Sequence, residues 1–121
     1  MYYKFENLNP LNSIELDCVC RAITNATKLD YYDVERKLKE VASLFDCEYL
    51  CVCCYKFLLD YVFGFTRIEE YQGMTIKEFL DKHPYGTFLI RVDGHLTMAR
   101  DSICYDTWDC TDCIVDIVWK C

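Results

Sequence analysis

Apolar residues at helical spacing predict two helices in the first half of the chain. The first runs from residue 18 to about residue 27, with Asp17 as its N-cap. The second runs from about residue 32 to residue 45, and its charged residues fall mostly on the face opposite the apolar stripe. Between residues 46 and 65 apolar residues would occupy every face of a helix, which fits a buried helix or a helix followed by a strand. We predict a helix over residues 48–61 of this segment.

A third, short helix is predicted over residues 75–83 from its boundary signals. Thr75 is a good N-cap, Glu78 stands three residues later and completes a capping box, and Pro84 follows the helix end. His83 lies in the last turn, where a cation is favoured by the helix dipole, so we interpret it as structural.

The last third of the chain changes to a period of two, which is typical of strands. Alternating segments span residues 87–93, 95–100, 102–107 and 113–119, and Gly86, Gly94 and Asp101-Ser102 supply the turns. Residues 1–16 are predicted to be an extended lead-in. We therefore predict one α+β domain over residues 1–121, with N-terminal helices packed on a C-terminal antiparallel β-sheet.

Composition narrows the function classes that this domain can serve. The 121 residues are 53% hydrophobic and carry a net charge of −7. Phosphate-backbone binding depends on lysine and arginine, so we expect no direct nucleic-acid ligand. An acidic surface can approach a basic protein, although simple solubility explains the charge as well. No apolar run has the length of a membrane span and the N-terminus lacks the apolar core of a signal peptide, so we expect a cytoplasmic protein with no membrane partner.

The chain contains ten cysteines, a share close to that of small disulfide-rich secreted domains. In a cytoplasmic protein we expect these thiols to be reduced and to pack as small hydrophobic groups. Cys110 and Cys113, together with a pair from Cys47, Cys51, Cys53 and Cys54, could bind zinc, and Cys110/Cys113 could form a redox pair. Because Cys53 and Cys54 are adjacent and fall in a predicted helix, we expect no metal ligand and no cofactor.

Three residues carry the candidate chemistry: Cys18, His95 and Asp106. Cys18 stands at a predicted helix start, where the dipole lowers a thiol pKa. His95 could activate this thiol if the sheet packs against the helix, and it then needs an acceptor on its other ring nitrogen. A two-residue turn at Asp101-Ser102 places His95 opposite Trp108, with Asp106 as a diagonal neighbour on the same face.

The same residues also have simpler interpretations. Cysteine is among the most buried residue types, so Cys18 taken alone is a packed thiol, and His95 taken alone is a structural histidine. Asp106 alone would be a turn or surface acid. A slip of one residue in the hairpin would turn Asp106 to the other face. Asp109 and Asp93 are weaker substitutes for it.

Four segments resemble a known group of proteins. Residues 17–23 (DCVCRAI), 83–90 (HPYGTFLI), 93–96 (DGHL) and 105–109 (YDTWD) are similar to small papain-like proteins of phages and bacterial mobile elements, which are related in fold to the bacteriocin leader peptidases. The resemblance covers residues 12–119 and implies a papain-like fold. It matches Cys18 to the nucleophile, His95 to the base and Asp106 to the orienting residue. Asn12 stands where papain-like enzymes usually carry a glutamine that donates to the oxyanion, beside the backbone N–H of Cys18.

Two functions follow from this resemblance. The first is a cysteine hydrolase that cleaves a peptide or another amide bond of a protein or peptide substrate. The second is a non-catalytic protein on the same fold that binds and inhibits a host defence protein, in the manner of an anti-CRISPR. A thiol-rich metal or redox module is a third alternative. Alanine in place of Cys18 is expected to abolish the hydrolase and to spare the binding protein.

Overall fold

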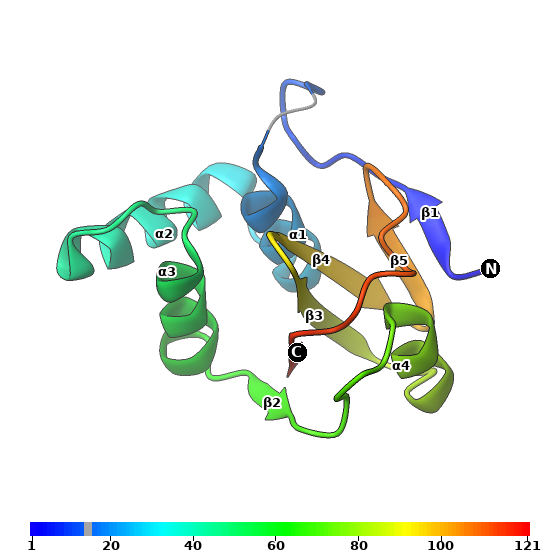
Figure 1. Ribbon diagram of the computed structural model, residues 1–121. Helices are drawn as coiled ribbons and strands as arrows, with labels where there is room; N and C mark the ends of the chain where they lie inside the picture. Colours follow the sequence, from blue (N-terminus) through cyan, green and yellow to red (C-terminus); the bar gives the residue numbers. More distant parts are fainter. Residues whose placement is uncertain (14–15) are drawn as a thin grey trace.

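A computed structural model describes residues 1–13 and 16–121 of the chain. The described residues form a mixed six-stranded sheet in the order β1-β5-β4-β3-β6-β2 (Figure 1). Its strands are β1 (Tyr3–Phe5), β2 (Thr66–Ile68), β3 (Thr87–Val92), β4 (His95–Arg100), β5 (Ile103–Asp106) and β6 (Ile117–Lys120). The helices are α1 (Cys18–Thr27), α2 (Tyr31–Phe45), α3 (Val52–Phe57), the π-helix η1 (Leu58–Val62) that continues α3, and α4 (Ile76–Lys82).

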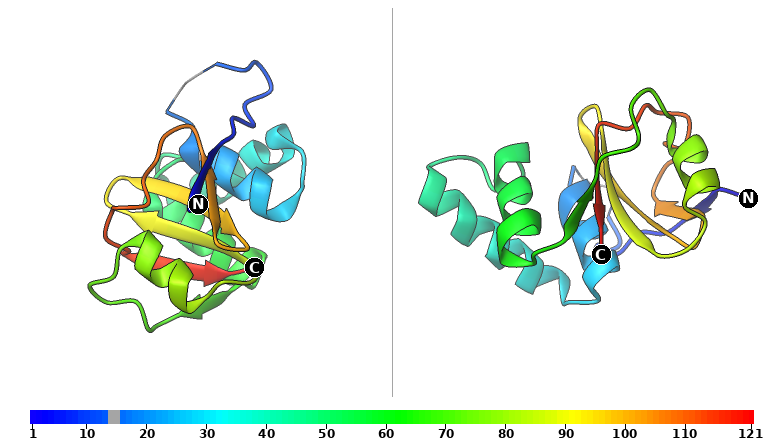
Figure 2. Two further views of the ribbon diagram at one scale, coloured as in Figure 1. Left: turned by 90° about the vertical axis from the view of Figure 1, so that its right-hand side faces the viewer. Right: turned by 90° about the horizontal axis from the view of Figure 1, so that it is seen from below.

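The helices cover the two faces of the sheet unequally. Helices α1, α2 and α3 lie on one side of the strands and α4 lies on the other (Figure 2). None of the helices in the described part of the chain is long and apolar enough to cross a membrane.

The period of two in the strands creates a separate apolar core on each face. In β3, Leu89 packs toward α1 and α2, whereas Phe88 and Ile90 pack toward α4. In β6, Trp119 packs in the core with α1 and α2, and Val118 packs in the core with α4. Because successive side chains of a strand point to opposite faces, one apolar run fills both cores. The α+β class predicted from the sequence is confirmed.

Several predicted elements match the structure closely. Helices α1, α2 and α4 and strands β3, β4 and β5 agree with the prediction to within one or two residues at each end. Asp101 and Ser102 both have positive φ, at 51° and 71°, as the tight turn between β4 and β5 requires. The hairpin register pairs Met98 with Tyr105, which extends to His95 opposite Trp108 as predicted.

Other predictions were wrong. The segment predicted as a helix over residues 48–61 is helical only from Val52, after a turn that follows α2. Asp17 occupies the N-cap position of α1 but makes no side-chain cap hydrogen bond, because its carboxylate binds other side chains. The last strand, predicted over residues 113–119, is confined to Ile117–Lys120.

The sheet is also not purely antiparallel. The lead-in contributes β1, which pairs parallel with β5 and places Phe5 beside Asp106. Strand β2 pairs with β6 at the opposite edge. Residues 14 and 15, which belong to the predicted lead-in, lie outside the described residues.

Helix α4 offers a local test of the fold. Thr75 accepts a hydrogen bond from the Glu78 backbone at 3.2 Å, and the Glu78 carboxylate accepts one from the Thr75 backbone at 3.1 Å. This is the predicted capping box. We expect Thr75→Ala to lower the free energy of unfolding by about 1 kcal/mol in urea denaturation. Ser43→Ala, at an exposed helical position outside any cap, is the control, and an equal loss in both variants would contradict the role of the cap.

Candidate active site

Cys18 is the first residue of α1 and lies where this helix meets the start of β4. The preceding residue, Asp17, is buried and holds the beginning of the helix in place. Cys18 lines the same cavity as His95 and Leu96, which begin β4. Helix α1 packs against the sheet through its buried residues Val19, Ala22 and Ile23. Packing of this amphipathic helix therefore places Cys18, the candidate nucleophile, beside the start of β4.

His95 and Asp106 meet across the β4–β5 hairpin. His95 begins β4 and Asp106 ends β5, and the register makes them diagonal neighbours on one face. The His95 Nε2 atom lies 2.6 Å from the Asp106 Oδ2 atom. Asp106 is buried, whereas His95 is partly exposed at the cavity. The Thr107 backbone N–H donates to Asp106 Oδ1 at 2.7 Å and helps to hold the carboxylate. The geometry predicted from hairpin arithmetic is present.

The surroundings shift the pKa values of all three groups. Burial opposes ionisation of Cys18, but its interaction with His95 and the Leu96 backbone outweighs burial, so the thiol pKa is lowered. Burial also opposes the charge on His95, yet the Asp106 hydrogen bond and the neighbouring thiols raise its pKa to about 11. Burial raises the Asp106 pKa, but the hydrogen bond and charge of His95, together with hydrogen bonds from neighbouring groups, outweigh burial and lower the pKa. The arrangement favours a thiolate beside an imidazolium.

A buried arginine, which sequence reasoning missed, ties this group to the start of α1. Arg21 is 8% exposed. Its Nε donates to Asp17 Oδ1 at 2.7 Å, and its Nη1 donates to Asp106 Oδ1 at 3.2 Å. The i, i+4 spacing of Asp17 and Arg21 was the only signal in the sequence. Arg21 therefore joins the helix that carries Cys18 to the strand that carries Asp106.

Asp17 is the other anchor of this network. Its Oδ2 accepts hydrogen bonds from the Tyr31 hydroxyl at 2.7 Å and from Asn9 Nδ2 at 2.9 Å. Burial raises the pKa of Asp17, but the hydrogen bonds from Tyr31 and Arg21 outweigh it and the net pKa is lowered. An ionised Asp17 thus connects α1 to α2 and to the lead-in.

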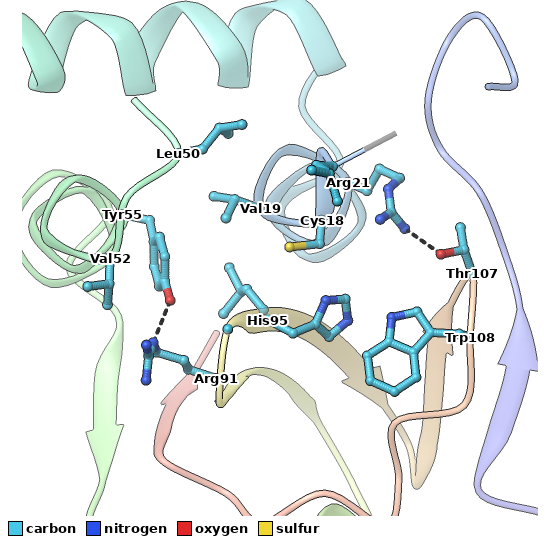
Figure 3. Close-up of a pocket in the computed structure, with 13 residues that line it drawn as sticks. Cys18, Val19, Arg21, Leu50, Val52, Tyr55, Arg91, His95, Thr107 and Trp108 are labelled. Carbon is cyan, nitrogen blue, oxygen red and sulfur yellow. Dashed lines mark hydrogen bonds between the residues drawn. The ribbon is translucent and has the colours of Figure 1, made fainter. Parts of the chain in front are cut away.

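Cys18 and His95 open onto a cavity of about 520 Å³. Figure 3 shows their side chains between Tyr55 and Arg91 on one side and Thr107 and Trp108 on the other. Arg91 donates to the Tyr55 hydroxyl at 2.8 Å and forms an ion pair with Asp116. Apolar side chains complete the walls: Leu16, Val19, Leu50, Val52, Leu96 and Trp108. Among the described residues, the lining includes two arginines and no acid, although the chain is strongly acidic.

Trp108 shields the imidazole. Its ring centroid lies 4.9 Å from that of His95, at an interplanar angle of 50°. Cys110 is fully buried, and its Sγ lies 3.9 Å from Asp106 Oδ2. The Trp108 contact restricts the orientation of the imidazole ring, and Cys110 packs against the carboxylate that binds it.

Not every predicted site residue reaches the cavity. Asn12 is exposed, has a positive φ of 55°, and is absent from the cavity lining, so the structure does not bring it to Cys18. The prediction relied on sequence spacing, whereas the chain turns at residues 9–12, where the Asn12 backbone N–H donates to the Asn9 carbonyl. Asp109 accepts from Thr111 at the surface and Asp93 is exposed in a turn. His83 stacks on Phe79, with ring centroids 4.4 Å apart, as a structural residue.

Comparisons of the chain with protein-family models, with curated proteins and with solved structures find no match.

Proposed function

We propose that the protein is a cysteine hydrolase that cleaves a peptide bond or another amide bond, with Cys18 as nucleophile, His95 as base and Asp106 as orienting residue. One observation carries the proposal: Cys18 and His95 line the same cavity, and His95 Nε2 lies 2.6 Å from Oδ2 of the buried Asp106. The neighbouring His95 also lowers the pKa of the Cys18 thiol. A nucleophile, a base and an orienting group in contact are the requirement for covalent catalysis by cysteine.

The proposed reaction has two stages. The Cys18 thiolate attacks the carbonyl carbon of the substrate, and the His95 imidazolium gives its proton to the departing amine, which leaves a thioester on Cys18. A water molecule then attacks the thioester, His95 takes a proton from it, and the acid product and the thiol are released. Asp106 accepts from His95 Nε2, so the other ring nitrogen is free to serve Cys18.

The chain supplies donors for the developing oxyanion at the start of α1. The first N–H groups of a helix have no partner within the helix, and they favour negative charge. Cys18 is the first residue of such a helix, so its own backbone N–H is the nearest candidate. The buried Arg21 cation also favours negative charge in this region.

We further propose that the fold is papain-like. Support comes from the order of the parts along the chain: a thiol at the start of a helix, then a histidine on a strand, then an acid on the neighbouring strand. The layered arrangement of α1 and α2 against the central strands is in keeping with this fold.

The activity test uses acyl transfer to Cys18. The protein is incubated with a panel of peptides that carry a fluorogenic amide and with activated esters, and intact-protein mass spectrometry detects an acyl group on the protein. We expect product release with at least one apolar acyl group, since apolar side chains dominate the cavity walls. Cys18→Ala is expected to lose acylation and turnover completely. Cys20→Ala removes a buried thiol of the same helix that does not line the cavity, and this variant is expected to retain both.

Acylation that persists in Cys18→Ala would refute the proposed nucleophile. No acylation by any member of the panel, together with an inert Cys18 thiol, would refute the hydrolase and favour the non-catalytic binding protein. In that case the cavity and the acidic surface would be tested for a protein partner, with high salt expected to weaken the complex.

A further inference from the structure

Four thiols gather in one place that the candidate active site does not use. Cys47, Cys51, Cys53 and Cys54 lie around the connection between α2 and α3, and their Sγ atoms are all within 4.8 Å of one another. The Sγ atoms of Cys47 and Cys54 are 2.9 Å apart, those of Cys51 and Cys53 are 2.6 Å apart, and those of Cys53 and Cys47 are 3.2 Å apart. All four are free thiols.

The backbone produces this cluster through a turn between the two helices. Asp46 ends α2 with a φ of 52°, in the left-handed region that reverses the chain. The Cys51 backbone N–H donates to the Glu48 carbonyl at 3.1 Å, which closes the next turn. Cys51 is then the N-cap of α3, and Cys53 and Cys54 follow in its first turn. Cys53 and Cys54 remain adjacent in α3, as predicted. The turn, however, brings Cys47 and Cys51 to them, so that all four Sγ atoms face one another.

We propose that Cys47, Cys51, Cys53 and Cys54 bind one Zn²⁺ ion as four thiolates. Tetrahedral zinc sites with four cysteine ligands have Zn–S bonds of about 2.3 Å, which correspond to S–S separations of roughly 3.8 Å. The four Sγ atoms already lie within 4.8 Å of one another, so small side-chain rotations produce this geometry. A soft, all-sulfur donor set selects zinc over calcium or magnesium.

Electrostatics favours a cation at the centre of the cluster. Four sulfur atoms at these distances cannot all be ionised without mutual repulsion, and a divalent ion offsets it. Cys54, in the first turn of α3, is fully buried, and its Sγ also contacts the Glu48 carbonyl at 3.1 Å. Cys53 is exposed, which leaves an entry path for the ion.

The site would be structural and would shape the neighbouring cavity. Leu50 and Val52, between the four ligands in the sequence, line the wall that faces Cys18 and His95. Tyr55 follows the last ligand and holds Arg91 at 2.8 Å. A bound ion would fix this wall without contributing a ligand to the reaction. Metal binding does not depend on the proposed hydrolase, because none of its ligands lines the cavity.

A second group of potential metal ligands must be distinguished from the four-cysteine cluster. His95, Asp106 and Cys110 also place a nitrogen, an oxygen and a sulfur atom within 4.8 Å of one another. In that group the His95 nitrogen and an Asp106 oxygen already bind each other at 2.6 Å. It offers a single sulfur, so the number of thiolates around the metal distinguishes the two sites.

The test measures metal content and ligand type on the full-length chain. The protein is reduced, loaded with Zn²⁺ and freed of excess metal. Its zinc content is then measured by inductively coupled plasma mass spectrometry. Loading with Co²⁺ instead reports the ligands, because tetrahedral thiolate coordination gives strong visible and near-ultraviolet bands. We expect one zinc per chain and a spectrum of tetrahedral cobalt bound by thiolates. Cys53→Ser is expected to lose both, and Cys113→Ser, outside the cluster, and His95→Ala are expected to keep both.

Three results would overturn the proposal: no zinc in the wild-type protein, unchanged zinc in Cys53→Ser, or loss of the thiolate spectrum in His95→Ala. If Cys53→Ser does not fold, the wild-type protein decides alone. Its Tm should then rise on addition of Zn²⁺ and fall on addition of a chelator. A Tm that changes with neither Zn²⁺ nor the chelator would also refute the site. So would a disulfide in the cluster that persists under reducing conditions and excludes the metal.

Discussion

Replacing His95 with alanine should slow the alkylation of Cys18 by iodoacetamide at pH 6–7 by roughly tenfold or more, since each unit of pKa changes the thiolate fraction tenfold in this range. In the native protein the interaction with His95 lowers the thiol pKa despite burial. Removing the imidazole leaves burial as the main influence, and burial raises a thiol pKa. The thiolate fraction below pH 7 therefore falls.

The pH dependence of Cys18 alkylation provides a second check on the direction of this effect. In the native protein the His95 pKa is raised to about 11, so the imidazolium persists well above neutral pH. Alkylation of Cys18 should accordingly begin below the ordinary thiol pKa of 9.0 and remain fast through neutral pH. In His95→Ala the rise in rate should move above that value. Peptide mass spectrometry assigns the label to Cys18 and separates it from the other cysteines.

The second histidine of the chain supplies a matched control. His83 stacks on Phe79 at the end of α4 and does not line the cavity. His83→Ala should leave the alkylation profile of Cys18 unchanged. Equal profiles in the wild type and His95→Ala would show that the histidine does not activate the thiol, and the proposed mechanism would then fail.

Replacing Arg21 with alanine should lower the free energy of unfolding at pH 7 by about 3–5 kcal/mol, the usual cost of removing one partner of a buried ion pair. Arg21 bridges Asp17 and Asp106, whose side chains are 8% and 3% exposed. Without it, two carboxylates remain buried with reduced compensation. The loss is a large part of the 5–15 kcal/mol by which a typical domain is stable.

The same variant should show a characteristic pH dependence. The pKa values of Asp17 and Asp106 are lowered in the folded protein, so their ionised forms contribute stability above about pH 4 and lose it as the pH falls through the folded-state values. The difference between wild type and Arg21→Ala should therefore be greatest near neutral pH and shrink in acid. Urea denaturation at a series of pH values measures it.

An exposed arginine serves as the control for this prediction. Arg36 forms ion pairs with Asp33 and Glu40 on the surface of α2, and its side chain is 62% exposed. Exposed pairs contribute little, so Arg36→Ala should cost less than about 0.5 kcal/mol. A similar cost for the two arginines, or an Arg21→Ala loss that does not change with pH, would contradict the buried network.

The amino-acid sequence alone determined the features that depend on neighbouring residues. The spacing of Val19, Ala22 and Ile23 predicted α1, and Thr75 with Glu78 predicted the start of α4. The two-residue turn between β4 and β5 set the register that brings His95 to Asp106. These predictions hold because helix periodicity, capping and hairpin register are decided within a few residues.

Features that depend on distant parts of the chain were decided only by the tertiary structure. Strand β1 is three residues long and is defined by its pairing with the edge of β5, which no local pattern reveals. Only the packing of α1 on the sheet buries Arg21 between Asp17 and Asp106. Asn12 has the expected spacing from Cys18, yet the chain turns it to the surface. The four clustered thiols come together through a turn in a segment that is apolar on all sides, where periodicity cannot tell a helix from a bend.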